Sequence, residues 1–191
     1  MKLFKFAIAG CALAALVACG GGGGDNAAVA PGSEVAVSPY VGNWKATSCE
    51  QVPEVTINNV AVYEQFYLKN VQANGATSVS ATGETQLFDN ATCTGAARAT
   101  HSFGISFTID GTVSVNGKTA DKITVTDKAI GGLSSGGTIM VNGITYPGDY
   151  FTRTSTDKDL SLVEGANWFF GIGDGLAYPT ALETSASLVK Q

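Results

Sequence analysis

The sequence has few of the residues that enzymes and nucleic-acid-binding proteins commonly rely on. It contains one histidine and four cysteines in 191 residues, and only 14% of its residues are charged. Its 11 lysines and arginines against 16 acidic residues give a formal net charge of −5, so no basic patch for nucleic acid is expected. One histidine with widely spaced cysteines does not make a zinc pattern, and we expect no metal and no cofactor.

The sequence also lacks an apolar run long enough to cross a bilayer as a helix. Its N-terminal apolar run, residues 6–18, has thirteen residues without a charge, whereas a spanning helix needs roughly 20. Lys2 and Lys5 precede the run, and small side chains end it. This pattern is typical of a secretory signal peptide. The sequence therefore predicts export, with residues 1–18 as the signal peptide.

The residues LVAC at positions 16–19 resemble the lipobox of bacterial lipoproteins. In that family the signal peptide is removed before the cysteine, which then carries acyl chains on its thiol and its new amine. The resemblance implies that Cys19 is lipidated and binds the protein to a membrane. It also implies the outer membrane, because Gly20 follows and the usual inner-membrane retention residue is aspartate. A rival match ending in Cys11 leaves too short an apolar core, and an ordinary signal peptide with a chance cysteine is the remaining alternative.

Residues 19–39 form a glycine-rich segment that we expect to act as a tether between the lipidated cysteine and the fold. Twenty residues of such a flexible chain span about 25 Å. The remaining residues, 40–191, suffice for a single domain with a hydrophobic core. They include Cys49 and Cys93, which we expect to form a disulfide in the oxidising compartment of an exported protein.

The domain reads as β-strands. From residue 98 to 109 the side chains alternate, so that one face carries Ala99, His101, Phe103, Ile105, Phe107 and Ile109. Shorter apolar faces occur in residues 60–68, 79–87, 123–125, 160–170 and near 188, and Asn-Gly pairs at 74–75, 116–117 and 142–143 predict tight turns. No stretch has a helical period. We therefore expect an all-β fold, an antiparallel up-and-down barrel of about eight strands, with a two-sheet β-sandwich as the alternative.

Gly42, Asn43 and Trp44 resemble the G-x-W motif of lipocalin-like barrels. The resemblance implies that Gly42 and Trp44 close one end of a barrel. GDYF at 148–151 resembles the second motif of that family, T-D-Y, with glycine in place of threonine. The third motif, a late arginine, is absent, and the last strand offers only Lys190. The domain is also similar to small proteobacterial lipoproteins of unassigned function, which share an opening Y-x-G-x-W, a cysteine pair and a closing tail like residues 178–191.

GLSSG at 132–136 matches the G-x-S-x-G motif of hydrolases, but its setting does not fit. That motif needs a strand-to-helix turn and a histidine after the serine, whereas His101 comes before it. A chymotrypsin-like arrangement would need more chain than the 34 residues between His101 and Ser135. We therefore expect no enzyme, with a serine hydrolase as a remote alternative and His101 as a packed strand residue.

Four residues are candidates for lining a ligand pocket: Tyr63, Glu64, Phe66 and Trp168. Glu64 stands in an apolar pattern, and if it faced inward it would mark a pocket, since a buried carboxylate must be solvated or paired. The preferred interpretation is that a bulge or register change turns Glu64 outward and that the aromatic residues fill the barrel. Asp157 and Asp159 are expected to be solvated charges in a polar turn.

These observations favour a lipid-anchored cell-envelope protein with a non-enzymatic structural or interaction role. Its partners would be the membrane, through Cys19, and an envelope protein. The alternative is a tethered lipocalin-like binder of a small apolar ligand.

Overall fold

The computed structural model describes residues 37–129, 138–141, 143–147 and 154–191. The signal peptide, Cys19, the tether up to residue 36, the GLSSG motif and the GDYF motif lie outside these residues. Residues 37–39, which the sequence analysis assigns to the tether, belong to the fold because Val37 is buried in its core.

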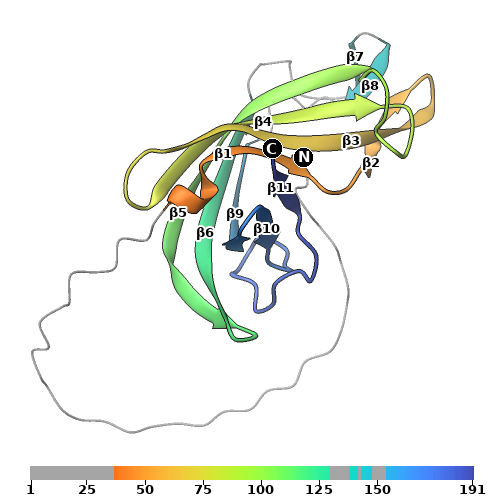
Figure 1. Cartoon of the computed structure of the whole chain (residues 1–191). Coiled ribbons are helices and arrows are strands. Elements are labelled where there is room, and N and C mark those ends of the chain that lie inside the picture. Colours follow the sequence, from red (N-terminus) through yellow and green to blue (C-terminus); the bar gives the residue numbers. More distant parts are fainter. Residues whose placement is uncertain (1–36, 130–137, 142, 148–153) are drawn as a thin grey trace, which may run out of the picture.

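The described chain is almost entirely β-structure (Figure 1). A single turn of 3-10 helix, η1 (Ser38–Tyr40), precedes the first strand. The strands are β1 (Gly42–Ala46), β2 (Glu50–Ile57), β3 (Val60–Ala73), β4 (Ser78–Phe88), β5 (Ala99–Val115), β6 (Lys118–Ala129), β7 (Thr138–Val141), β8 (Ile144–Pro147), β9 (Thr154–Glu164), β10 (Asn167–Phe170) and β11 (Leu188–Lys190).

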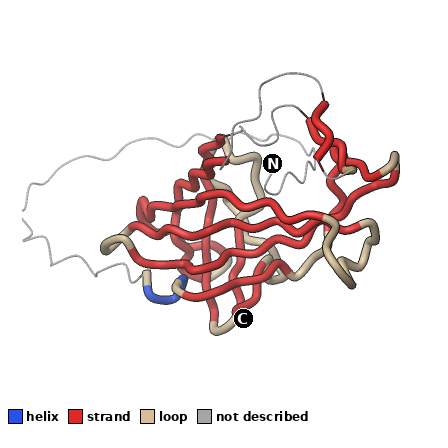
Figure 2. The backbone as a smooth tube through the Cα atoms, turned by 90° about the horizontal axis from the view of Figure 1, so that it is seen from above, coloured by secondary structure: helices blue, strands red, loops and turns tan. Residues whose placement is uncertain are grey.

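Eight strands close an antiparallel barrel in the order β1-β11-β10-β9-β6-β5-β4-β3, and the pairing of β1 with β3 completes the ring. The prediction of an all-β antiparallel barrel of about eight strands is confirmed, and the sandwich alternative is wrong. Strands β3, β4, β5 and β6 follow one another in sequence and in space, as an up-and-down order requires. Figure 2 shows these long strands from above, with η1 near the turn between β3 and β4.

Three strands stand outside the ring and were not predicted. β2, β8 and β7, named here the side sheet, extend from β3 in that order. They can do so because β3 changes partner along its length: residues 67–71 pair with β1, and residues 60–64 pair with β2. One strand thus supports the ring with one half and the side sheet with the other (Figure 1).

The alternation in β5 is borne out by burial. His101, Phe103, Ile105, Phe107 and Ile109 are buried, while the residues between them are exposed or half-buried. Such alternation is typical of an antiparallel strand with one solvated face. The Asn-Gly pair at 116–117 forms the predicted turn between β5 and β6, with positive φ at both residues.

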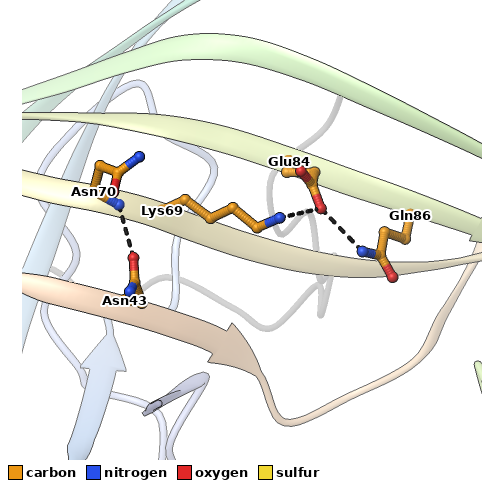
Figure 3. A network of polar contacts seen from close by, with 5 residues as sticks. All are labelled: Asn43, Lys69, Asn70, Glu84 and Gln86. Carbon is orange, nitrogen blue, oxygen red and sulfur yellow. Dashed lines mark hydrogen bonds and ion pairs between the residues drawn. The ribbon is translucent and has the colours of Figure 1, made fainter.

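The outer face of the ring is polar. Lys69 Nζ lies 2.7 Å from Glu84 Oε1, and Gln86 Nε2 donates to the same carboxylate at 2.9 Å (Figure 3). Nearby, the register of β3 shifts after Lys69, and the Asn70 N–H donates to Asn43 Oδ1 at 2.8 Å. This β-bulge keeps the core face of β3 continuous past Asn70, because Leu68 and Val71 are both buried.

The predicted disulfide is present. Cys49 and Cys93 are bonded, with their Cα atoms 5.7 Å apart. The bond joins the corner between β1 and β2 to the loop between β4 and β5, so the side sheet is attached to the ring by a covalent link as well as by strand pairing.

Candidate functional site

One end of the barrel is filled by aromatic side chains. Trp44 and Trp168 are almost completely buried, and their ring centroids lie 5.1 Å apart in an edge-on contact. Tyr40 packs against Trp168 at 5.0 Å. The indole N–H of Trp44 donates to the Tyr40 carbonyl, and that of Trp168 donates to Ser161 Oγ, each at 2.7 Å. Trp168 is therefore a packing residue of the filled end, with its polar atom already satisfied.

Gly42 and Trp44 lie in β1, and both are close to Lys190 of β11. Gly42 has a φ of +131°, and a Cβ added there would lie 3.0 Å from Lys190 Cε. Glycine thus leaves room for Lys190, whose Nζ lies 5.4 Å from the centroid of the Trp44 ring in a cation–π contact.

A partly buried polar contact attaches η1 to the barrel wall. The Tyr40 hydroxyl donates a hydrogen bond to Asp121 Oδ2 of β6. Burial, ahead of this hydrogen bond, raises the pKa of Tyr40 well above its ordinary value, and burial also raises the pKa of Asp121. The tyrosine therefore stays protonated and keeps η1 at the filled end.

Glu64 faces the interior of the molecule, and the expectation that a bulge turns it outward is wrong. β3 is in continuous register with β4 from Tyr63 to Lys69, and the bulge follows Lys69. Val62, Phe66 and Leu68, which alternate with the outer-face residues, are buried on the same face as Glu64. The carboxylate atom Oε2 is buried and has no hydrogen-bond partner among the residues that the structure describes.

The environment of Glu64 disfavours its charged form. Burial is the largest cause, followed by the negative charges of Glu50 and Glu54, and together they raise its pKa to about 7. Glu50 is the direct cross-strand partner of Glu64, and such neighbours have Cβ atoms about 5 Å apart. Glu64 therefore keeps its proton to a higher pH than an ordinary glutamate does.

Glu64 lies between two apolar clusters. One cluster, named here the filled-end cluster, contains Trp44 and Trp168 and extends to Phe66 of β3 and Phe103 of β5. The second cluster lies under the side sheet and consists of Val52, Val55, Val62, Leu87, Ile144 and Tyr146. Polar residues occupy the boundary between the two clusters. Thr85 and His101 are cross-strand partners there, and both are buried.

His101 is a packed strand residue in this boundary layer. Its ring stacks on Phe103 with centroids 5.8 Å apart, and burial lowers its pKa. The imidazole is therefore held neutral at physiological pH. The two serines of the hydrolase motif, Ser134 and Ser135, lie outside the described residues.

The structure places three of the four candidate lining residues, Glu64, Phe66 and Trp168, toward the interior. Glu64 and Phe66 share the inner face of β3. Tyr63 lies between Val62 and Glu64 in the alternation and therefore points to the outer face. Trp168 belongs to the filled end.

A second buried acid, Asp159, was missed by the sequence analysis. Asp157 and Asp159 are not in a turn but in β9, where they pair with Val125 and Ile123, so they share the inward face. Asp159 Oδ1 accepts hydrogen bonds from the backbone N–H groups of Leu160 and Gly171, at 2.7 and 2.9 Å. Burial outweighs these bonds and raises the pKa of Asp159 to about 7. The signal was the alternation of residues 155–161, in which every second residue is Ser or Asp.

The described part of the chain shows no group of three or more His, Cys, Asp or Glu residues placed to hold a metal ion. In the same residues no helix is long and apolar enough to cross a membrane.

Fold and site together define a closed eight-stranded antiparallel β-barrel with one filled end, a side sheet and acids buried in its interior. No family model matches the chain, and neither the curated proteins nor the solved structures give a match.

Proposed function

We propose that the protein is an exported lipoprotein, held in the outer membrane by acyl chains on Cys19, and that its barrel has a non-enzymatic structural or interaction role. The observation that carries the proposal is the sequence LVAC after a signal-peptide-like run. Two or more acyl chains would anchor the protein stably, at about 0.8 kcal/mol per buried CH₂. Residues 20–36 lie in sequence between Cys19 and Val37, the first residue that the structure describes.

The state of His101 supports a role without catalysis. A general base must reach the proton that it abstracts, whereas His101 is buried and stacked on Phe103. The large apolar side chains that are exposed in the described residues are scattered over four elements or loops and include no aromatic residue; they are Val41, Val60, Met140, Ile172 and Leu176. An interaction role would therefore rest on polar surfaces such as the outer face of β1, β3 and β4.

A second candidate function is the binding of a small ligand inside the barrel. It is favoured by the buried Oε2 atom of Glu64, because buried polar atoms in folded proteins are nearly always hydrogen-bonded. A ligand that donates a hydrogen bond would satisfy this atom. Native mass spectrometry of residues 26–191 would identify this candidate by a mass excess that is lost on denaturation.

The anchor is tested by replacing the cysteine that carries it. We expect C19A to move the protein from the membrane fraction to the soluble fraction of the envelope, because no acyl chain remains to bind the bilayer. C11A, which removes the rival lipobox, is the matched control and is expected to leave membrane association unchanged. Membrane association of C19A equal to that of the wild type would contradict the proposal, as would its loss in C11A alone.

A further inference from the structure

Two Asn-Gly pairs lie in turns of the barrel that the structure describes. Asn74 and Gly75 belong to the turn between β3 and β4, Asn116 and Gly117 form the turn between β5 and β6, and all four residues are exposed. An asparagine followed by glycine can react with its own backbone, because glycine has no Cβ to obstruct the approach of its nitrogen to the asparagine side chain. The two pairs are chemically alike, so a difference in their reactivity must come from the fold. The third pair includes Asn142, which lies outside the described residues.

The turn that contains Asn74 leaves its backbone room to rotate. Four residues, 74–77, lie outside the strands. The Asn74 N–H donates to the Ser78 carbonyl at 2.8 Å, whereas the Gly75 N–H donates no hydrogen bond within the described residues. A Cβ placed on Gly75 would meet no atom within 4 Å. The Gly75 nitrogen is therefore unshielded, and the chain around it can rotate without separating paired strand residues.

The turn that contains Asn116 is shorter and is held on both sides. Asn116 and Gly117 alone stand between Val115 and Lys118, which are paired across the hairpin. Both turn residues have positive φ, +52° and +77°, as a tight two-residue turn requires, whereas Asn74 does not have a positive φ. To react, an asparagine must bring its Cγ onto the nitrogen of the next residue, which takes a rotation about its Cα–C bond. In this turn such a rotation would separate Val115 from Lys118.

We propose that Asn74 is a site of spontaneous covalent modification in the folded protein, and that the β5–β6 hairpin protects Asn116 from the same reaction. The Gly75 nitrogen gives its proton to hydroxide and forms a bond to Asn74 Cγ, and the C–N bond of the side-chain amide breaks. The amide nitrogen leaves as ammonia, and the product is a five-membered succinimide ring. Water opens the ring at one of its two carbonyl groups, which gives aspartate or isoaspartate. The net change is the exchange of ammonia for water, and nothing is oxidised or reduced.

The modification changes the charge and the main chain of one turn. It places a new negative charge between β3 and β4, near η1, which precedes the first strand of the barrel (Figure 2). The isoaspartate product also adds one carbon atom to the main chain. Because residues 74–77 lie outside the strands, the turn takes up this atom and the Ala73–Val79 pair that follows the turn on both sides is kept.

The site is tested by incubating the mature protein in detergent micelles in mildly alkaline buffer and digesting it with pepsin in acid, which stops the reaction. Mass spectrometry then measures, for each turn, the mass gain that accompanies replacement of an amide by a carboxyl group. Two free peptides, residues 71–79 and 113–121, report the rates without the fold and are expected to react alike. In the protein, Asn74 should keep roughly its peptide rate, and Asn116 should react about tenfold or more slowly, because it reacts only when the end of the hairpin opens.

Two matched variants make the test specific. N74Q has a longer side chain that would have to close a six-membered ring, so it should abolish the mass gain in residues 71–79 and leave Asn116 as in the wild type. N116Q should leave the reaction of Asn74 unchanged. The proposal is overturned if Asn74 in the folded protein is as slow as Asn116, if Asn116 keeps its peptide rate, or if the mass gain in residues 71–79 persists in N74Q.

Discussion

The free energy of unfolding is expected to fall by several kcal/mol when the pH is raised from 5 to 8. The main cause is the burial of two acids, Glu64 and Asp159, whose pKa values in the folded protein are both about 7. Asp121, whose pKa burial also raises, acts in the same direction. In the unfolded chain such acids have pKa values near 4, so between pH 4 and 7 the folded state binds more protons than the unfolded state. Stability must then decrease as the pH rises through this interval and level off above it.

The size of the effect follows from the same linkage. Each acid contributes about 1.4 kcal/mol per pH unit within its interval, or on the order of 2–3 kcal/mol between pH 5 and 8. His101 acts in the opposite direction, because burial lowers its pKa and stability then rises with pH up to the unfolded value near 6.5. Glu84, Asp89 and Asp110 have lowered pKa values, so their contributions are lost only at more acidic pH.

Urea unfolding at several pH values between 5 and 8 measures this dependence. Because His101 is common to all variants, the comparison of E64Q and D159N with the wild type isolates the two acids. Each variant is expected to remove part of the decrease, and the double variant most of it. A wild-type stability that stays constant or rises across the whole interval would show that these acids are not buried as described.

Removal of the Cys49–Cys93 disulfide is expected to lower the free energy of unfolding by on the order of 4 kcal/mol, because the bond closes a long loop in the unfolded chain. Its sequence separation is 44 residues. Since a domain of this size has about 5–15 kcal/mol in total, the loss is a large fraction of its stability. The disulfide is also the covalent attachment of the side sheet, so its loss should affect β2 before the ring.

The measurement is urea unfolding of C49A/C93A beside the wild type, with and without a reducing agent. Reduction should destabilise the wild type and leave the double variant unchanged. Two free thiols in the non-reduced wild type, found by mass spectrometry, would contradict the disulfide itself.

The barrel could be predicted because its signals are local. The alternation in β5 assigns each residue to a face, and the Asn-Gly pair at 116–117 supplies the turn that follows it. The disulfide could be predicted because an exported protein meets an oxidising compartment and because the domain contains two cysteines. The side sheet could not be predicted, because it depends on β3 pairing with β1 in one half and β2 in the other, and nothing in the alternation of β3 marks that change.

The site was predicted less well than the fold. Glu64 was noticed as an interruption of an apolar face, but whether a bulge precedes or follows it depends on pairing with β4, and the bulge follows Lys69. Asp159 was missed because every second residue from 155 to 161 is polar, which is typical of a solvated face. That face of β9 is covered at Asp159 by pairing with β6 and by the chain after β10, and neither contact can be read from the residues beside it. Trp168 and Tyr63 are of residue types that often line pockets. Whether each one does so depends on which face of the barrel its side chain occupies.

The lipid anchor is tested most directly at the mature N-terminus. Intact-mass and peptide analysis of the protein extracted from envelopes with detergent measures it directly. We predict a chain that begins at Cys19 and carries the mass of a diacylglyceryl group and an N-linked acyl chain. A chain that begins elsewhere, or an unmodified Cys19, would contradict the proposal of a lipid-anchored envelope protein.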